Sequence, residues 1–296
     1  MRLLITDLDN TLYDWVTYFA NAFRAMVNEL AVILSVEEER LLDEFQIVHQ
    51  RYGNSEQPFA VFELPSVRER FGDLSKAELF EALRTPLAAF RAARSKHLSL
   101  YPSVRPTLYC LRENGVRIVG HTEAIGVQAY SRLRTLRIVD HFHRIYALEG
   151  HLSPHPDPLR NPAQQPPPGL INVVPAHERK PNPDLLRDIC IRERIPQEEA
   201  WYVGDSKTKD VAMAKRAGVT AVWAKYGTEY DVALWEIVKR VTHWSRQDVM
   251  REETLETVFQ DIEPDYIIDS FSEILTLSGI TTNSPQLDLA GVSTNS

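Results

Sequence analysis

The chain has 296 residues, of which 44% are hydrophobic and 25% are charged, and its formal net charge is −8 at pH 7. This composition is ordinary for a globular protein and supplies enough apolar residues for one large domain or two smaller ones. The acidic balance, together with the lack of a basic stripe, argues against nucleic acid as a partner and favours a small molecule.

Both cysteines, Cys110 and Cys190, lie in apolar helical patterns, so we expect buried free thiols and no disulfide. The first residues enter a strand pattern at once, unlike a signal peptide. No apolar run has the length of a membrane span, so we expect no membrane contact. These features favour a reducing, cytoplasmic location.

The first predicted strand is the apolar run 3–6, which leads into Asp7-Leu8-Asp9-Asn10-Thr11-Leu12. Because side chains alternate along an extended backbone, Asp7 and Asp9 leave the strand on the same side. Their carboxylates then repel each other unless a cation, such as a divalent metal, lies between them. The alternative is that the two acids simply end a strand and start a turn.

Helical spacing of apolar residues follows this strand. It predicts a long helix from Trp15, whose stripe with Phe19 and Phe23 we interpret as core. A capping box at Ser35 predicts a second helix as far as Tyr52.

The segment Arg51–Ser55 interrupts the helical pattern. It is a candidate substrate-facing loop, although an ordinary connection between helices is the simpler interpretation. A third helical segment covers residues 61–70, and a capping box at Ser75 predicts one long helix to His97. Together these helices predict a bundle at residues 15–99, inserted directly after the first strand.

Strands and helices alternate in the rest of the chain. Predicted strands cover residues 116–120, 144–148, 170–174, 200–203, 220–223 and 266–268, and predicted helices cover 106–114, 127–136, 183–189, 211–217, 231–259 and 270–277. Such alternation implies a parallel sheet with right-handed crossovers. The expected fold is therefore α/β, with a Rossmann-like three-layer core formed by residues 1–14 and 100–278.

Two segments lack periodicity. Residues 153–169 are rich in proline and predict a loop, and residues 279–296 predict a disordered tail. Four histidines lie in or before the proline-rich loop. Their spacing fits no standard zinc pattern, so we interpret them as solvated residues, namely His141, His143, His151 and His155.

Polar residues follow three of the predicted strands: Asp7 and Asp9 after the first, Thr122 after the second and Asp205 after the fifth. The carboxyl ends of parallel strands lie at the same edge of a sheet, where α/β proteins bind ligands. We therefore expect these side chains to lie close together.

This arrangement resembles the haloacid dehalogenase-like hydrolase superfamily, whose four motifs match in order. The first matches Asp7 to Leu12, the second Thr122, the third Lys180 before Pro181, and the fourth Gly204-Asp205 with Asp210. One departure is Glu123, since the family often has a small or amide residue after the motif-two threonine.

The resemblance implies a catalytic role for four residues. Asp7 would be the nucleophile that attacks phosphorus. Asp9 would protonate the leaving oxygen and then activate water. Lys180 would neutralise charge on the phosphoryl group, and Thr122 would donate a hydrogen bond to it. For Thr122 the alternative is a helix N-cap, and for Lys180 a solvated surface residue.

The resemblance also implies Mg²⁺ as cofactor. Asp7, Asp205 and the backbone carbonyl of Asp9 would bind it, because Mg²⁺ prefers oxygen ligands. Asp210 would support the site by holding Lys180 or a metal-bound water, and the alternative for Asp210 is a helix N-cap.

The implied function is a magnesium-dependent phosphatase of a small phosphorylated metabolite, such as a sugar phosphate, phosphoglycolate or a nucleoside monophosphate. The carboxylate of Asp9 favours phosphoryl transfer over dehalogenation, because displacing halide needs no proton donor. A noncatalytic phosphate- and metal-binding scaffold of the same fold and a phosphomutase are the alternatives. The bundle at 15–99 resembles the family's type 1 cap, which closes over the site.

Overall fold

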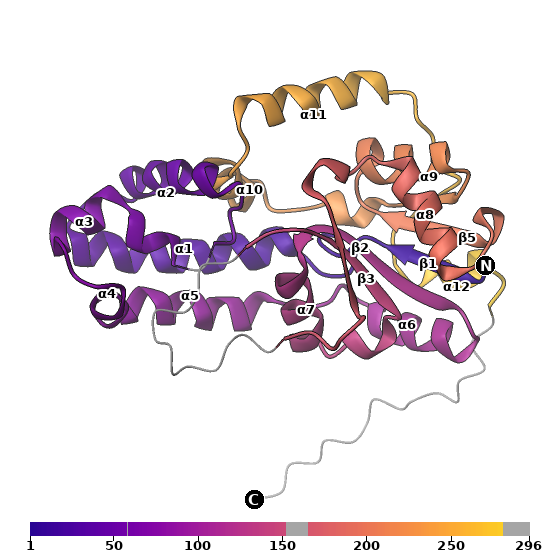
Figure 1. The fold of residues 1–296 in the computed structure, drawn as a ribbon, viewed down its shortest axis with the longest axis horizontal. Helices are drawn as coiled ribbons and strands as arrows, with labels where there is room; N and C mark the ends of the chain where they lie inside the picture. The colour runs from indigo at the N-terminus through magenta and orange to yellow at the C-terminus, as the bar shows by residue number, and fades with distance from the viewer. Residues whose placement is uncertain (58, 152–164, 281–296) are drawn as a thin grey trace, which may run out of the picture.

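The computed structural model describes residues 1–57, 59–151 and 165–280. Its strands form one sheet in the order β4-β3-β2-β1-β5-β6-β7, and every pairing is parallel (Figure 1). The strands are β1 Leu3–Thr6, β2 Arg117–Ile125, β3 Arg144–Leu148, β4 Ile171–Val174, β5 Ala200–Gly204, β6 Thr220–Ala224 and β7 Tyr266–Ile268. The predicted Rossmann-like α/β fold is confirmed.

A run of helices follows β1, and helices also precede or follow most of the later strands in the described residues. They are α1 Trp15–Leu34, α2 Glu38–Tyr52, α3 Pro65–Phe71, α4 Lys76–Ala82, α5 Arg84–His97, α6 Val104–Glu113, α7 Gly126–Thr135, α8 Pro183–Glu193, α9 Ala212–Ala217, α10 Val232–Val241, α11 Arg246–Val258 and α12 Glu273–Leu277. A π-helical turn at Lys207–Val211 precedes α9.

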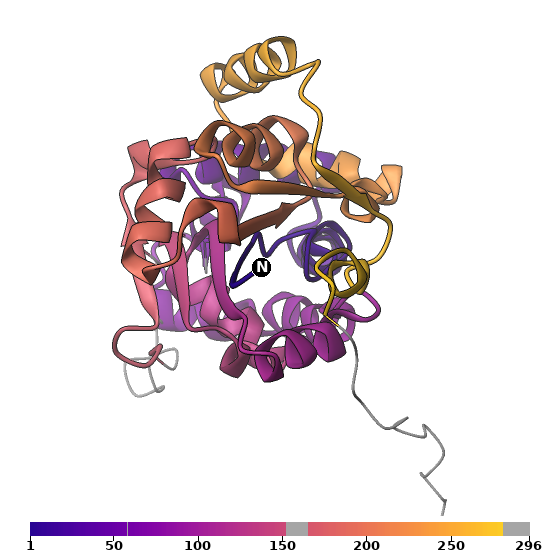
Figure 2. The ribbon, with the colours of Figure 1, turned by 90° about the vertical axis from the view of Figure 1, so that its right-hand side faces the viewer.

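The central strand β1 is buried on both faces. Leu3 and Ile5 belong to the cluster that includes α8 and α9, whereas Leu4 belongs to the cluster that includes α6, α7 and α12. The sheet thus separates two helical layers (Figure 2). Thr6 is in register with Gly120 of β2 and Val203 of β5, so the carboxyl ends of β1 and β5 lie side by side with β2.

Helices α1 to α5 extend away from the sheet, between β1 and β2 in the sequence (Figure 1). Phe19 and Phe23 are buried in the main core cluster, and Trp15 stacks on Phe19 with a ring-centroid distance of 4.8 Å, which confirms the interpretation of this stripe as core. Whether these helices act as a mobile cap, and where the domain boundaries fall, stay predictions.

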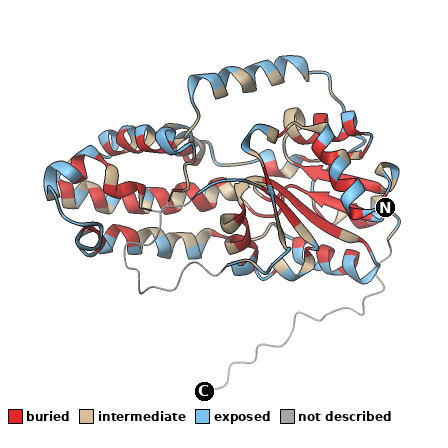
Figure 3. Cartoon of the chain, viewed as in Figure 1, coloured by how far each residue is buried: buried red, intermediate tan, exposed pale blue. Residues whose placement is uncertain are grey.

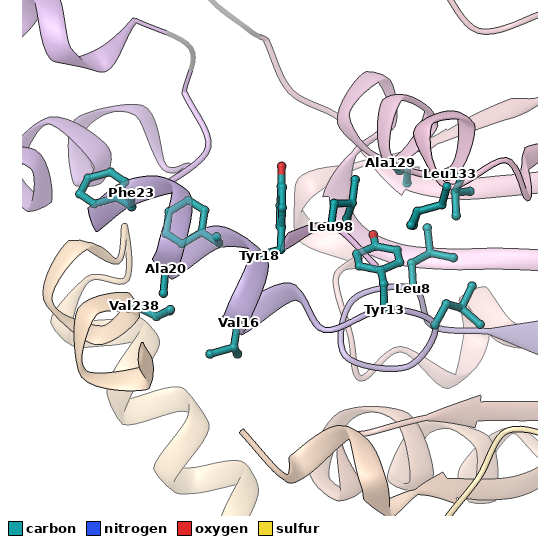
Figure 4. Packing of buried hydrophobic residues seen from close by; sticks show 14 of the residues in the cluster. Leu8, Tyr13, Val16, Tyr18, Ala20, Phe23, Leu98, Ala129, Leu133 and Val238 are labelled. Carbon is teal, nitrogen blue, oxygen red and sulfur yellow. The ribbon is translucent and has the colours of Figure 1, made fainter. Parts of the chain in front are cut away.

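Helix α10 packs against α1 and α2, although it lies between β6 and β7 in the sequence. Figure 4 shows Val238 of α10 beside Val16 and Ala20 of α1. Arg240 also pairs with Asp43 of α2 at 2.7 Å. The following helix, α11, has no buried residue and lies on the outside of the molecule (Figure 3).

Three helix predictions were wrong. Ser35 adopts a left-handed conformation with φ of 56° and ends α1, so the capping box predicted there does not form. The capping box at Ser75 does form, but its helix stops at Ala82. Pro86, which lacks an N–H, fits in the first turn of a new helix and not in the interior of a long one.

The predicted helix 231–259 is also two helices. It breaks after Val241, and α11 starts at a new capping box between Ser245 and Asp248. Strand β2 is longer than predicted and runs to Ile125, so Thr122 lies within it, next to a register shift against β3.

The remaining expectations concern the two cysteines, the four histidines near the proline-rich loop, the tail and membrane-spanning helices. Cys110 and Cys190 are buried and free, as predicted. His143 and His151 are exposed, and His141 is partly buried. His155, residues 153–164 of the proline-rich loop and residues 281–296 of the predicted tail lie outside the described residues. In the described ranges no single helix has the length and apolarity to cross a membrane; α1 and α2 do so only as a bent pair.

Candidate active site

Asp7 is the first residue after β1, and its position is fixed by backbone and side-chain contacts. Its N–H donates to the carbonyl of Val203 in β5 at 2.9 Å, and its side chain is 10% exposed. The hydroxyl of Thr11 lies 3.5 Å from Asp7 Oδ2 and 3.4 Å from Asp205 Oδ1. Thr11 therefore links the acids that follow two neighbouring strands.

Lys180 lies between two carboxylates. Its Nζ donates to Oδ1 of Asp7 and, at 2.8 Å, to Oδ1 of Asp210, and its side chain is 4% exposed. The interpretation of Lys180 as a solvated surface residue is therefore wrong. Asp210 also accepts hydrogen bonds from the Tyr202 hydroxyl and the Ser206 N–H, each at 3.1 Å.

The placement of Asp210 requires a glycine at the end of β5. A Cβ atom at Gly204 would lie 2.3 Å from Oδ2 of Asp210, a distance that real contacts do not allow. The alternative role of Asp210 as a helix N-cap is wrong, because Ser206 caps the π-helical turn by accepting from the N–H of Lys209.

Charge accumulates around Asp7. Burial raises the pKa of the Asp7 carboxyl to about 7; Lys180 lowers this pKa, while Asp210 and Asp9 raise it. Burial, followed by the charges of Asp7 and Asp210, raises the pKa of Asp205 well above its usual range. Burial lowers the pKa of Lys180, but Asp210 and Asp7 outweigh it and raise that pKa well above its ordinary value. Lys180 carries one positive charge, whereas Asp7, Asp205 and Asp210 can carry three negative charges. The charge balance of the site therefore favours the binding of a further cation.

Three carboxylates have the spacing of a metal site. Each of Asp7, Asp205 and Asp210 offers an oxygen, and these atoms lie within 4.8 Å of one another. Such an all-oxygen set fits Mg²⁺. The side chain of Asp9 is not in this group, so its predicted contribution through the backbone carbonyl stays a prediction.

Thr122 lies beside Asp9. Its hydroxyl donates to Asp9 Oδ2 at 3.4 Å and accepts from the N–H of Ala124 at 3.0 Å. The alternative role of Thr122 as a helix N-cap is wrong, because β2 continues to Ile125 and that residue precedes α7. Glu123 pairs with Lys209 at 3.3 Å, so this departure from the motif does not leave an unpaired charge at the site.

A buried group that no sequence motif marks lies on the other side of Asp9. Arg132 of α7 contacts Asp9, Tyr13 and Glu56 and is 0% exposed. Burial raises the pKa of the Asp9 carboxyl, and Arg132 counteracts this rise. An arginine in the buried stripe of a helix was the available signal, but its partners lie 76 to 123 residues away in the sequence.

The geometry brings the predicted residues from β1, β2, β5 and the turn before α8 to one edge of the sheet. A model described as haloacid dehalogenase-like hydrolase matches residues 1–218, and one described as HAD-hydrolase-like matches residues 177–274. The chain belongs to the haloacid dehalogenase-like hydrolase family.

Curated relatives of this hydrolase are named as phosphatases. A glyceraldehyde 3-phosphate phosphatase from Methanopyrus kandleri is 29% identical over 236 residues, which are 78% of this chain and 87% of the relative. A phosphoglycolate phosphatase from Pseudomonas putida is 28% identical over 230 residues, 76% of this chain and 70% of the relative.

Solved structures share the fold of this hydrolase. A 2-haloacid dehalogenase from Pseudomonas syringae has a TM-score of 0.52 and 19% identity, with 94% of this chain and 98% of that chain covered. A HAD phosphatase from Thermococcus onnurineus has a TM-score of 0.51, also with 19% identity and the same coverage. At these identities the likeness describes the fold alone.

Proposed function

We propose that this hydrolase is a magnesium-dependent phosphatase that hydrolyses a small phosphorylated metabolite through a phosphoaspartate at Asp7. The observation that carries the proposal is the contact of Lys180 with both Asp7 and Asp210, in a buried group of three carboxylates. Such a group provides a nucleophile, a fixed cation and oxygen ligands for a metal at one place.

Asp7 and Asp9 divide the chemistry. A carboxylate oxygen of Asp7 attacks phosphorus, and the bond from phosphorus to the leaving oxygen breaks as Asp9 donates its proton to that oxygen. Asp9 then takes a proton from a water that attacks the phosphoaspartate. Inorganic phosphate leaves and the Asp7 carboxylate is restored.

The neighbouring groups hold charge in place. Lys180 keeps one oxygen of Asp7 oriented and stabilises the negative charge of the phosphoryl group. Mg²⁺, held by Asp7, Asp205 and the backbone carbonyl of Asp9, would neutralise part of the phosphate charge, with Asp210 as a supporting or additional ligand. Thr122 would turn its hydroxyl to a phosphoryl oxygen.

The names of the curated relatives support the proposed substrate class. Their names include glyceraldehyde 3-phosphate and phosphoglycolate, which are both small monophosphate esters. We therefore rank a sugar phosphate or phosphoglycolate above a nucleoside monophosphate. The helices α1 to α5 are proposed as the cap that excludes water and contacts the organic part of the substrate.

The test is release of inorganic phosphate from these three classes of ester, with Mg²⁺ or with EDTA. We expect Mg²⁺-dependent release that falls more than about a thousandfold in Asp7→Asn. Asp184→Asn is the matched control, because the Asp184 side chain is 86% exposed and pairs with Arg187 away from the site. Wild-type rates in Asp7→Asn would refute the nucleophile.

Two other functions give different results in the same assay. A scaffold binds Mg²⁺ and fluoroberyllate but releases no phosphate from any ester. A phosphomutase moves phosphate between positions of a sugar without net release. Either result would replace the phosphatase proposal.

A further inference from the structure

Arg132 is a buried cation with no part in the reaction described above. It lies in α7, its side chain is 0% exposed, and its guanidinium contacts groups from three separate parts of the chain. Burying a charge is costly unless its hydrogen bonds are satisfied, so this position needs an explanation.

One part of the guanidinium holds Asp9. Nη2 of Arg132 lies 3.3 Å from both carboxylate oxygens of Asp9. Nε donates to the Tyr13 hydroxyl at 2.9 Å, and Tyr13 in turn interacts with the Asp9 carboxyl and lowers its pKa. Figure 4 shows the Tyr13 ring near Leu8, Ala129 and Leu133, and all four residues belong to the main core cluster. Asp9 is thus held directly and through Tyr13.

The other part of the guanidinium holds residues 53–57, which are called here the loop after α2. Nη1 of Arg132 lies 2.7 Å and 2.6 Å from the two oxygens of Glu56. The indole of Trp15 also donates to Glu56 at 3.1 Å, and the side chain of Gln128 donates to the Glu56 carbonyl at 2.7 Å. The loop is therefore attached to the core beside Asp9.

The same loop is held on its other side by the segment after α10. Ser55 of the loop and His243 share a hydrogen bond of 2.9 Å, and Gln50, in the last turn of α2 before the loop, donates to the carbonyl of Trp244 at 3.1 Å. Displacing the loop from Asp9 would therefore break the contacts of Glu56 with Arg132 and the hydrogen bond of Ser55 with His243.

We propose that Arg132 is a positioning residue that holds the Asp9 carboxylate toward the leaving group and ties this position to Glu56 in the loop after α2. The inference rests on the proposed function. General acid catalysis needs the acid within hydrogen-bond reach of the leaving oxygen, so a displaced Asp9 slows only reactions that require its proton. Asp9 is then in place when the loop is attached and displaced when it is not.

The test compares two leaving groups in Arg132→Met. The first substrate is an alkyl ester, phosphoglycolate or glyceraldehyde 3-phosphate, whose alkoxide is a poor leaving group and needs a proton. The second is 2,4-dinitrophenyl phosphate, whose dinitrophenolate leaves without one. We expect the single-turnover rate with the alkyl ester to fall about a hundredfold, and the burst of dinitrophenolate to change by less than about threefold.

Arg117→Met is the matched control. Arg117 pairs with the buried Glu193 at 3.2 Å, outside the site. Its loss should lower the stability of the fold and change the rates of hydrolysis of the two esters by the same factor. Tyr13→Phe is the second test variant if Arg132→Met does not fold, and it should show a smaller loss with the same selectivity.

The tie to Glu56 is tested with Glu56→Gln and the double variant. If Glu56 acts on Asp9 through Arg132, Glu56→Gln should slow hydrolysis of the alkyl ester. In the double variant with Arg132→Met it should cause no further loss of rate. Additive losses would refute this tie.

Equal slowing of both esters in Arg132→Met or Tyr13→Phe would refute positioning and leave a structural role. A wild-type protein that releases phosphate from neither ester would instead refute the proposed function, and this inference with it.

Discussion

The Nζ of Lys180 donates to Oδ1 of Asp210 at 2.8 Å, and these side chains are 4% and 3% exposed. The same Nζ contacts Asp7. Asp210 therefore holds the lysine against the proposed nucleophile, and the charge of Lys180 stabilises the charges of both acids in a largely buried place.

Removing this cation should affect both stability and rate. In Lys180→Met the acids lose their fixed partner, so we expect the free energy of unfolding in EDTA to fall by about 3 kcal/mol. Phosphate release should fall at least about a hundredfold. Urea denaturation and the phosphate assay measure these quantities. The control is Lys215→Met, whose half-buried pair with Asp265 should contribute less than about 1 kcal/mol. An unchanged rate would contradict the role of Lys180.

Binding of Mg²⁺ should stabilise the folded chain. At a hundredfold excess over its dissociation constant, the ion would add about 2.7 kcal/mol, because it binds the folded state alone. The check is the thermal midpoint with Mg²⁺ and with EDTA. Asp205→Asn should lose most of this shift, because it removes one of the three clustered carboxylates. Asp184→Asn should keep it. A full shift in Asp205→Asn would place the ion elsewhere.

A methyl group at the end of β5 should disturb the site. In Gly204→Ala the new Cβ would meet Oδ2 and Cγ of Asp210 at 2.3 Å and 2.4 Å. Asp210 must move away, and Lys180 loses one partner. We expect phosphate release to fall at least about tenfold. Gly115→Ala is the control, because Gly115 has φ of 75° with no atom near its Cβ position, so strain there leaves the rate unchanged. Equal rates in the two variants would contradict this placement of Asp210.

Stability should fall in weak acid because of His49. This residue is 1% exposed and its Nδ1 donates to the carbonyl of Val241 at 2.6 Å. Burial lowers the pKa of His49 to about 4. The unfolded chain binds a proton near pH 6.5 and the folded chain only near pH 4, so stability is lost as the pH falls between these values.

The loss amounts to about 3 kcal/mol for a pKa difference of this size. Urea denaturation from pH 7 to pH 4 measures it. His49→Gln should flatten the pH dependence by this amount, whereas His177→Gln, which changes an exposed side chain, should not. A His49→Gln curve parallel to wild type would contradict the assignment.

The sequence by itself determined the sheet and the acids at its edge. A buried strand is a short apolar run, and polar residues at the ends of parallel strands meet because the strands run in one direction. For this reason Asp7, Thr122 and Asp205 could be placed together from local patterns, whereas Lys180 was placed there only by the family resemblance. Helix ends were harder, since Ser35 and Pro86 depend on how the chain turns next.

The tertiary structure alone decided the surroundings of Asp9. Arg132, Glu56 and Tyr13 carry no pattern that marks them as partners, because they meet only when α7 and the loop after α2 are packed against β1. The packing of α10 on α1 likewise depends on contacts between apolar faces far apart in the sequence. Periodicity shows that a face is apolar, but many faces of similar shape compete to cover it, and the whole fold selects among them.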